Sequence, residues 1–242
     1  MIVLKLGGSV ITEKDERETV DLDSLARLAG VLGQADVDDL VIVHGAGSFG
    51  HYYADEHGVS TTDGTRDARA VREIHDSMTR LNKAVLDYLD DAGVPGVPVR
   101  PFSAARRDDG LEFYANQVET MLAEGFTPVL HGDVVADAGA GATILSGDEV
   151  VTALAAQLDA DRVGLCSTVP GVLDDDGDVI PAVDAYDDVA AVLGGSEDTD
   201  VTGGMAGKVR ELLALDAPAS VFGPDDLADF LRGEDAGTTV RG

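Results

Sequence analysis

Residues 40–51 of the 242-residue chain are Leu-Val-Ile-Val-His-Gly-Ala-Gly-Ser-Phe-Gly-His, and this stretch decides the fold. The apolar run Leu40–Val43 predicts a strand of a parallel sheet that is buried on both faces. Residues 44–51, here called the histidine segment, should therefore lie at the carboxyl end of that strand, where open α/β sheets bind ligands. Its glycines let backbone amides approach an anion, and His51 adds a side-chain donor. An ordinary strand-to-helix turn would also use these glycines.

The pattern on both sides of this stretch predicts a single α/β domain. A strand at Ile2–Leu6, a helix over 21–34 and the strand at 40–43 form a βαβ unit. Residues 57–67 are expected to be exposed and mobile, with His57 and His75 in contact with solvent. The other predicted elements are helices over 65–92, 116–124, 149–158, 209–215 and 227–231, strands over 97–100, 128–130, 161–166, 219–222 and 238–240, and a hairpin over 134–145.

The composition indicates a folded protein with an acidic surface. The chain has 46 acidic and 17 basic residues, a formal net charge of −29, and 44% apolar residues. Nucleic acids and anionic membranes are therefore unfavourable partners. Few lysines and many aspartates resemble the composition of proteins from a salt-rich cytosol, such as that of a halophilic archaeon.

Cysteine content and hydropathy favour a cytoplasmic location. Cys166 is the only cysteine, so no intrachain disulfide can form, and its apolar surroundings indicate a small buried side chain. The chain begins on a strand-like run without a signal peptide, and no apolar stretch approaches the ~20 residues of a membrane span.

Three of the four lysines lie beside glycine-rich turns. Lys5 and Lys14 flank Gly7-Gly8-Ser9, and Lys208 follows Gly203-Gly204, so their cations can converge on one anion. The Lys208 motif lacks the spacing of a Walker loop. The alternative is that Lys5 is an edge-strand charge and Lys14 a solvated loop residue. Asp148 opens the helix over 149–158 and either caps it or holds lysines in place.

Four motifs occur in the order found in the amino acid kinase superfamily: residues 5–9, the histidine segment, residues 146–148 and residues 203–208. The segment Gly8-Ser9-Val10-Ile11-Thr12 with Lys14, together with the histidine segment, resembles the archaeal isopentenyl phosphate kinase family. The resemblance covers nearly the whole chain. One departure is Ala46, where many relatives have glycine; alanine should be tolerated unless the position needs a positive φ.

The resemblance implies a three-layer αβα sandwich with a mainly parallel central sheet, an acceptor lobe over 1–145, an ATP lobe over 146–242, and a homodimer. The implied reaction transfers phosphate from MgATP to isopentenyl phosphate, giving isopentenyl diphosphate for isoprenoid synthesis. Magnesium would be held by phosphates and water, without a protein ligand. The apolar stripe that includes Met78 is then either core or part of a pocket for the acceptor's tail.

The resemblance also implies roles for individual residues. Lys5 and Lys208 would hold the ATP phosphates, oriented by Asp148, and Lys14 would stabilise the transferring phosphoryl group. His51 would bind the acceptor phosphate with Ala46, Gly50 and Gly132. The remaining implied ATP-site residues are Gly7, Gly8, Ser9, Gly47, Ser167, Asp174, Gly203 and Gly204. Of these, the first four would supply amide donors, and Ala46 and Gly132 would likewise bind the acceptor phosphate through their backbone. His44 and His131 are expected only to stabilise strand ends by hydrogen bonds.

Two other functions fit the same motifs. One is a kinase of the same fold with a carboxylate, carbamate or phosphonate acceptor, and the other is a non-catalytic anion-binding protein. An amino-acid acceptor would require matching polar side chains, whereas the histidine segment and the apolar stripe favour a phosphate head with an apolar tail. Three lysines beside separate glycine turns in a lysine-poor chain argue against simple anion binding.

Overall fold

The computed structural model describes residues 1–193 and 204–242, and two sheets organise these residues. The larger sheet has eight strands, all parallel to their neighbours except for the antiparallel pair β11 and β12. In spatial order its strands are β10 (Ala182–Val183), β12 (Thr238–Val240), β11 (Ala219–Phe222), β9 (Arg162–Cys166), β1 (Ile2–Leu6), β2 (Leu40–His44), β6 (Thr127–His131) and β3 (Gly96–Pro98).

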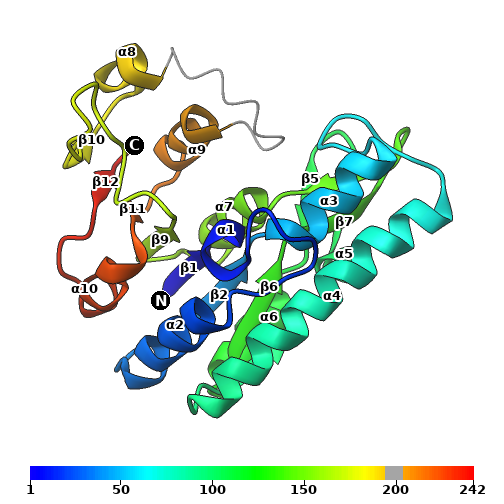
Figure 1. Cartoon of the computed structure of the whole chain (residues 1–242), viewed down its shortest axis with the longest axis horizontal. Helices are drawn as coiled ribbons and strands as arrows, with labels where there is room; N and C mark the ends of the chain where they lie inside the picture. Colours follow the sequence, from blue (N-terminus) through cyan, green and yellow to red (C-terminus); the bar gives the residue numbers. More distant parts are fainter. Residues whose placement is uncertain (194–203) are drawn as a thin grey trace.

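Helices cover both faces of this sheet, and Figure 1 shows α2 and α4 side by side across one of them. The helices are α1 (Gly8–Ile11), α2 (Leu22–Gln34), α3 (Gly47–His57), α4 (Ala68–Asp91), α5 (Pro101–Ala104), α6 (Asn116–Ala123), α7 (Gly147–Gln157), α8 (Ala190–Leu193), α9 (Gly204–Leu213) and α10 (Leu227–Arg232), with short 3-10 turns η1 (Tyr186–Asp188) and η2 (Pro224–Asp226). No described helix has both the length and the apolar character needed to span a membrane.

Alternating side chains of the central strands fill two separate cores. Val3 and Val41 belong to the core beneath α6, α7 and α9, whereas Leu4 and Ile42 belong to the core beneath α2, α4 and α10. This alternation follows from the two-residue period of a strand and explains why these strands are apolar throughout. The predicted three-layer αβα sandwich is therefore confirmed, and Met78 is buried on the inner face of α4.

A second, four-stranded sheet was only half predicted. Its order is β5 (Leu111–Phe113), β4 (Ala105–Arg107), β7 (Asp133–Asp137) and β8 (Gly141–Leu145). The hairpin of β7 and β8 is confirmed. The hairpin of β4 and β5 was not predicted, because each strand has only three residues, too short to produce a clear alternation of apolar and polar residues.

Residues 59–65 run along the outer edge of β8, which was not predicted. Residues 62–64, 66 and 67 are exposed as expected, and the mobility of this passage stays a prediction. The Ile144 amide donates to the Ser60 carbonyl at 2.8 Å, and Thr65 and Ala142 exchange two backbone hydrogen bonds of 2.9 Å. His57 and His75 are partly exposed, as expected, but each also has a carboxylate partner that was not predicted: His57 contacts Glu73 at 2.7 Å and His75 contacts Asp133 at 2.8 Å. All these contacts join residues that are distant in the sequence, so local sequence patterns do not predict them.

The histidine segment is mostly the first turn of a helix. After β2, only Gly45 and Ala46 connect the strand to α3, which was not predicted. Gly47 has a φ of +50°, and Ala46 has a φ of −79°, so alanine at position 46 is unstrained, as expected. Similarly, α9 begins at Gly204, so that Lys208 lies one turn inside the helix rather than at its start.

The turns after β1 and β2 pack backbone against backbone. A Cβ atom added at Gly8 would lie 2.1 Å from the Gly47 nitrogen, and one added at Gly45 would lie 2.5 Å from the Gly8 nitrogen. No flexible side chain at these contacts could move aside. The glycines are therefore required by packing between adjacent strand ends, whatever ligand they also face.

We expect Gly8→Ala to lower the free energy of unfolding by about 2 to 3 kcal/mol, because the backbone of the neighbouring turn must shift. Gly30→Ala is the matched control: it lies inside α2 with nothing within 4 Å of the added Cβ, and should raise the stability by about 0.5 to 1 kcal/mol. Urea unfolding at constant salt measures both. Equal effects of the two variants would contradict the packing argument.

Candidate active site

Two adjoining cavities lie at the carboxyl ends of the central strands. The smaller has a volume of about 230 Å³ and the larger about 890 Å³. Both are lined by Ser9, His51, Ser167, Thr168 and Lys208. The site is therefore continuous from the N-terminal turns to α9, as expected for ligands bound at the carboxyl edge of a parallel sheet.

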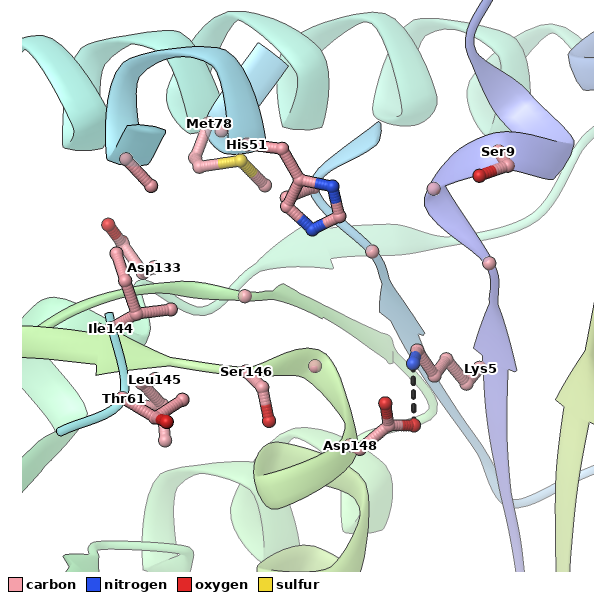
Figure 2. Close-up of a pocket in the computed structure, with 18 of the residues that line it drawn as sticks. Lys5, Ser9, His51, Thr61, Met78, Asp133, Ile144, Leu145, Ser146 and Asp148 are labelled. Carbon is pink, nitrogen blue, oxygen red and sulfur yellow. Dashed lines mark hydrogen bonds and ion pairs between the residues drawn. The ribbon is translucent and has the colours of Figure 1, made fainter. Parts of the chain in front are cut away.

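The smaller cavity has a polar end and an apolar end. Lys5 and Ser9 lie at one end, while Met78 and Ile144 lie at the other, with His51 directed into the space between them (Figure 2). Ala54 and Ile74 add further apolar surface to the lining. Such a cavity accommodates an elongated ligand with an anionic head and an apolar tail.

A buried ion pair lies at the polar end. The Lys5 ammonium donates to Oδ1 of Asp148 at 2.5 Å, and the two residues are 8% and 5% exposed. Burial alone would raise the pKa of Asp148, but the positive charges of Lys5 and Lys208 outweigh this effect and lower it. Asp148 thus remains ionised and holds Lys5 as predicted, although no hydrogen bond joins it to Lys208 within the described chain.

The start of α7 fixes the position of Asp148. Ser146, not Asp148, caps the helix, because Ser146 and Glu149 form a reciprocal capping box. Arg107 donates to Glu149 at 3.0 Å and thereby ties the smaller sheet to this turn. The capping role considered for Asp148 was therefore wrong, and its carboxylate is available to Lys5.

Four backbone amides near the cavities have no acceptor among the described residues: those of Gly8, Ser9, Ala46 and Gly47. They lie at the starts of α1 and α3, where helix geometry leaves amides unpaired and favours anions. The expected amide donors at Gly7 and Gly132 were wrong. The Gly7 amide donates to Cys166 and the Gly132 amide to His44, so both link neighbouring strands.

His44 and His131 lie opposite each other on β2 and β6, with ring centroids 5.4 Å apart. Each Nδ1 lies within hydrogen-bond distance of the next residue's carbonyl, which confirms their predicted role at the strand ends. Burial lowers the pKa of His44 to about 4, and burial with the nearby His44 holds the pKa of His131 well below its usual value. Both rings are therefore neutral near pH 7.

The remaining predicted side chains are distributed between the cavities. Lys14 is exposed and lines only the larger cavity, together with Gly47 and Gly204. Lys208 and Ser167 line both, and Ala46, Gly50 and Gly132 line the smaller one.

One predicted ATP-site residue is not brought to the cavities. Asp174 lines neither one; its carboxylate accepts the amides of Asp176 and Asp178 at 2.9 Å and stabilises a local turn. Gly203 lies outside the described residues.

Several residues of the site were missed by sequence reasoning. Thr12 donates to the Gly8 carbonyl and accepts the Ser48 amide, so it joins the two glycine turns. Asp133, which follows a predicted strand end, lines the smaller cavity and accepts a hydrogen bond from His75. Thr12 lies within the Gly8–Thr12 motif and Asp133 directly follows a predicted strand end, so the sequence offered a signal for both. No local sequence pattern identifies His75 as a residue of the site.

Comparison with known proteins identifies the family. Residues 1–215 match the model of the amino acid kinase family. An isopentenyl phosphate kinase from Haloferax volcanii is 60% identical over the whole chain and 99% of the relative's length, and one from Methanothermobacter thermautotrophicus is 38% identical over 89% of this chain and 86% of the relative. The chain belongs to the isopentenyl phosphate kinases of the amino acid kinase family.

Solved structures agree with this assignment. X-ray structures of isopentenyl phosphate kinase superpose with a TM-score of 0.84 at 31% identity, covering 98% of this chain and 99% of the other. The Haloferax relative also agrees with the halophilic origin that the acidic composition predicts. The fold and the kinase assignment are thus established, while the roles of individual side chains in this member of the family rest on the geometry above.

We expect Asp148→Asn to lower the free energy of unfolding by about 3 to 5 kcal/mol, because it leaves the Lys5 charge buried beside Lys208. Asp87→Asn is the matched control, since Asp87 also pairs with a lysine, Lys83, at 2.5 Å but on the exposed face of α4. This exposed pair should contribute no more than about 0.5 kcal/mol. Urea unfolding measures both variants. If Asp148→Asn lowers the free energy of unfolding as little as Asp87→Asn does, the Lys5–Asp148 pair is not required for stability.

Proposed function

We propose that this protein uses ATP to phosphorylate isopentenyl phosphate and forms isopentenyl diphosphate. One observation carries the proposal: a single cavity joins a lysine-lined and amide-lined end to an apolar end, with His51 between them. The relatives named as isopentenyl phosphate kinases support the same acceptor. A monophosphate head at the polar end would leave the five-carbon tail against Ile74, Met78 and Ile144.

In this proposal the protein acts through position and charge. Lys5 and Lys208 bind ATP phosphates and offset the charge that moves during transfer, while Asp148 fixes Lys5. His51 and the amide of Ala46 bind the acceptor phosphate, and Lys14 approaches the transferring group from the larger cavity. A phosphate oxygen is already ionised near neutral pH, so in-line transfer needs no strong base; orientation and electrostatic stabilisation supply the acceleration.

Magnesium in this proposal binds mainly to phosphates and water. No group of three histidine, cysteine, aspartate or glutamate side chains within the described ranges is arranged to hold a metal ion. Asp148, the acid nearest the lysines, is already bonded to Lys5. A small hard cation that keeps most of its waters fits this donor set, and it would neutralise phosphate charge.

The proposal assigns the two ligands to different parts of the chain. Tail-pocket residues such as Ala54 and Ile144 all precede residue 146, which supports an acceptor lobe over 1–145. Ser167, Gly171 and Met205 line the larger cavity, which supports ATP binding by the lobe over 146–242. We extend the proposal to a cytoplasmic homodimer; the exposed aromatic side chains Tyr114 and Phe126, at opposite ends of α6, support self-association.

An acceptor panel tests the reaction. In molar potassium chloride with MgATP, we expect rapid ADP release with isopentenyl phosphate, slower or equal release with dimethylallyl phosphate, and none above background with acetylglutamate, glutamate, carbamate or fosfomycin. The one acid at the apolar end, Asp133, already accepts a hydrogen bond from His75 and is therefore not free to pair with the amino group of an amino-acid acceptor (Figure 2). Turnover only with a carboxylate, carbamate or phosphonate would retain the nucleotide site and reject the acceptor, whereas folded protein inactive with every acceptor would favour a binding protein.

His51→Ala should lower kcat/KM for isopentenyl phosphate by about 100-fold, because one donor to the reacting phosphates is lost. The affinity for MgADP should change by less than about twofold, since Lys5 and Lys208 remain. His57→Ala serves as the control: His57 lies on the same helix but contacts Glu73 outside both cavities. If the two variants have the same acceptor kinetics, His51 has no role in acceptor binding.

A further inference from the structure

Glu211 is a half-buried acid beside the active-site lysines that the proposed mechanism does not use. It follows Lys208 by three residues on α9, so the two side chains share a helix face. Its Oε2 atom is inaccessible to solvent and has no hydrogen-bond partner among the described residues. A carboxylate oxygen in this position is costly to keep ionised, and a proton would remove the charge.

Charged groups from three elements act on Glu211. Asp148 and Glu149, at the start of α7, repel its negative charge, while Lys5 on β1 and Lys208 on α9 attract it. Arg107 is bonded to Glu149, and Arg210 of α9 lies over the Tyr186 ring instead. Burial, followed by the two acids, raises the pKa of Glu211 to about 7 against the opposing effect of the lysines.

Nucleotide phosphates would change this balance. With Lys5, Lys208, Asp148 and an ionised Glu211, the cluster has no net charge. Nucleotide phosphates keep a net negative charge even with magnesium bound, so their binding to the lysines adds negative charge near Glu211. That charge disfavours the ionised carboxylate. Because coupling between two ligands is reciprocal, a proton on Glu211 must also favour the nucleotide.

We propose that Glu211 takes up a proton when nucleotide phosphates occupy the Lys5–Lys208 site, so that nucleotide affinity falls as the pH rises through neutrality. The inference rests on the proposed nucleotide site and adds a positioning residue to it. Well below pH 7 Glu211 is protonated with and without nucleotide, and the affinity is constant. Above pH 7 the free protein has lost the proton that the complex retains, so binding must recover it.

Isothermal titration calorimetry with MgADP, without acceptor, tests the coupling between pH 6.5 and 8.5 at constant salt. If nucleotide raises the pKa of Glu211 by one unit, the wild-type Kd should rise about sixfold over this range, with uptake of about half a proton near pH 7.5. Two buffers with different ionisation enthalpies measure the uptake.

Glu211→Gln mimics the protonated acid and should bind MgADP with the same affinity throughout this range, close to that of wild type at pH 6.5. Glu119→Gln, which changes an exposed acid of α6, should behave as wild type. Titration of ADP itself is common to all three proteins and cancels in the comparison. A pH dependence shared by wild type and Glu211→Gln would overturn the proposal.

Two further results are decisive. If Glu211→Gln and Glu211→Ala both fail to fold, absence of proton uptake by the wild type overturns the inference and uptake near pH 7.5 supports it. If MgADP does not bind the folded wild type at any pH, the nucleotide site itself is wrong. Binding without pH-dependent coupling rejects the role of Glu211 alone.

Discussion

The buried ion pair of Lys5 and Asp148 is the constraint on which the site depends. The pair exists because β1 alternates its side chains, so Lys5 faces α7 while Leu4 and Leu6 face the opposite core. Two charges removed from water stabilise a structure only when their geometry is held closely. The capping box of α7 and the bond from Arg107 of β4 to Glu149 supply that rigidity. Glu211 shares the field of the same two lysines, but its Oε2 atom has no hydrogen-bond partner among the described residues.

Most of the fold was predictable because it follows from local periodicity. The apolar runs of β1, β2 and β9 and the apolar stripe of α4 have the repeat of the structure that they form. Helix α3 was missed because its sequence, Gly-Ser-Phe-Gly-His-Tyr-Tyr, begins with poor helix formers and has no regular apolar stripe. Tertiary contacts select that helix: Phe49 and Tyr53 are buried, and Thr12 accepts the Ser48 amide.

The charged side chains of the site could be predicted from the sequence, but the backbone amides that are free to bind an anion could not be predicted reliably. Lys5, His51, Asp148 and Lys208 come together because the carboxyl ends of neighbouring parallel strands and the following helices share one edge. The amides of Gly7 and Gly132 were misassigned, because residue type does not reveal whether an amide is already bonded to a neighbouring strand. Asp133 and His75 are 58 residues apart, and only the docking of α4 beside β7 joins them.

Residues 59–65 have a consequence beyond the pocket that they help to line. By hydrogen bonding to β8, they cover the outer edge of the smaller sheet, which would otherwise present unpaired amides and carbonyls to another molecule. Charge repulsion would offer weak protection in concentrated salt, where the Debye length shrinks to about 3 Å at 1 M. In such a solvent, a highly acidic surface is therefore not enough to prevent edge-to-edge aggregation. Residues 59–65 of the same chain protect the edge of β8 instead.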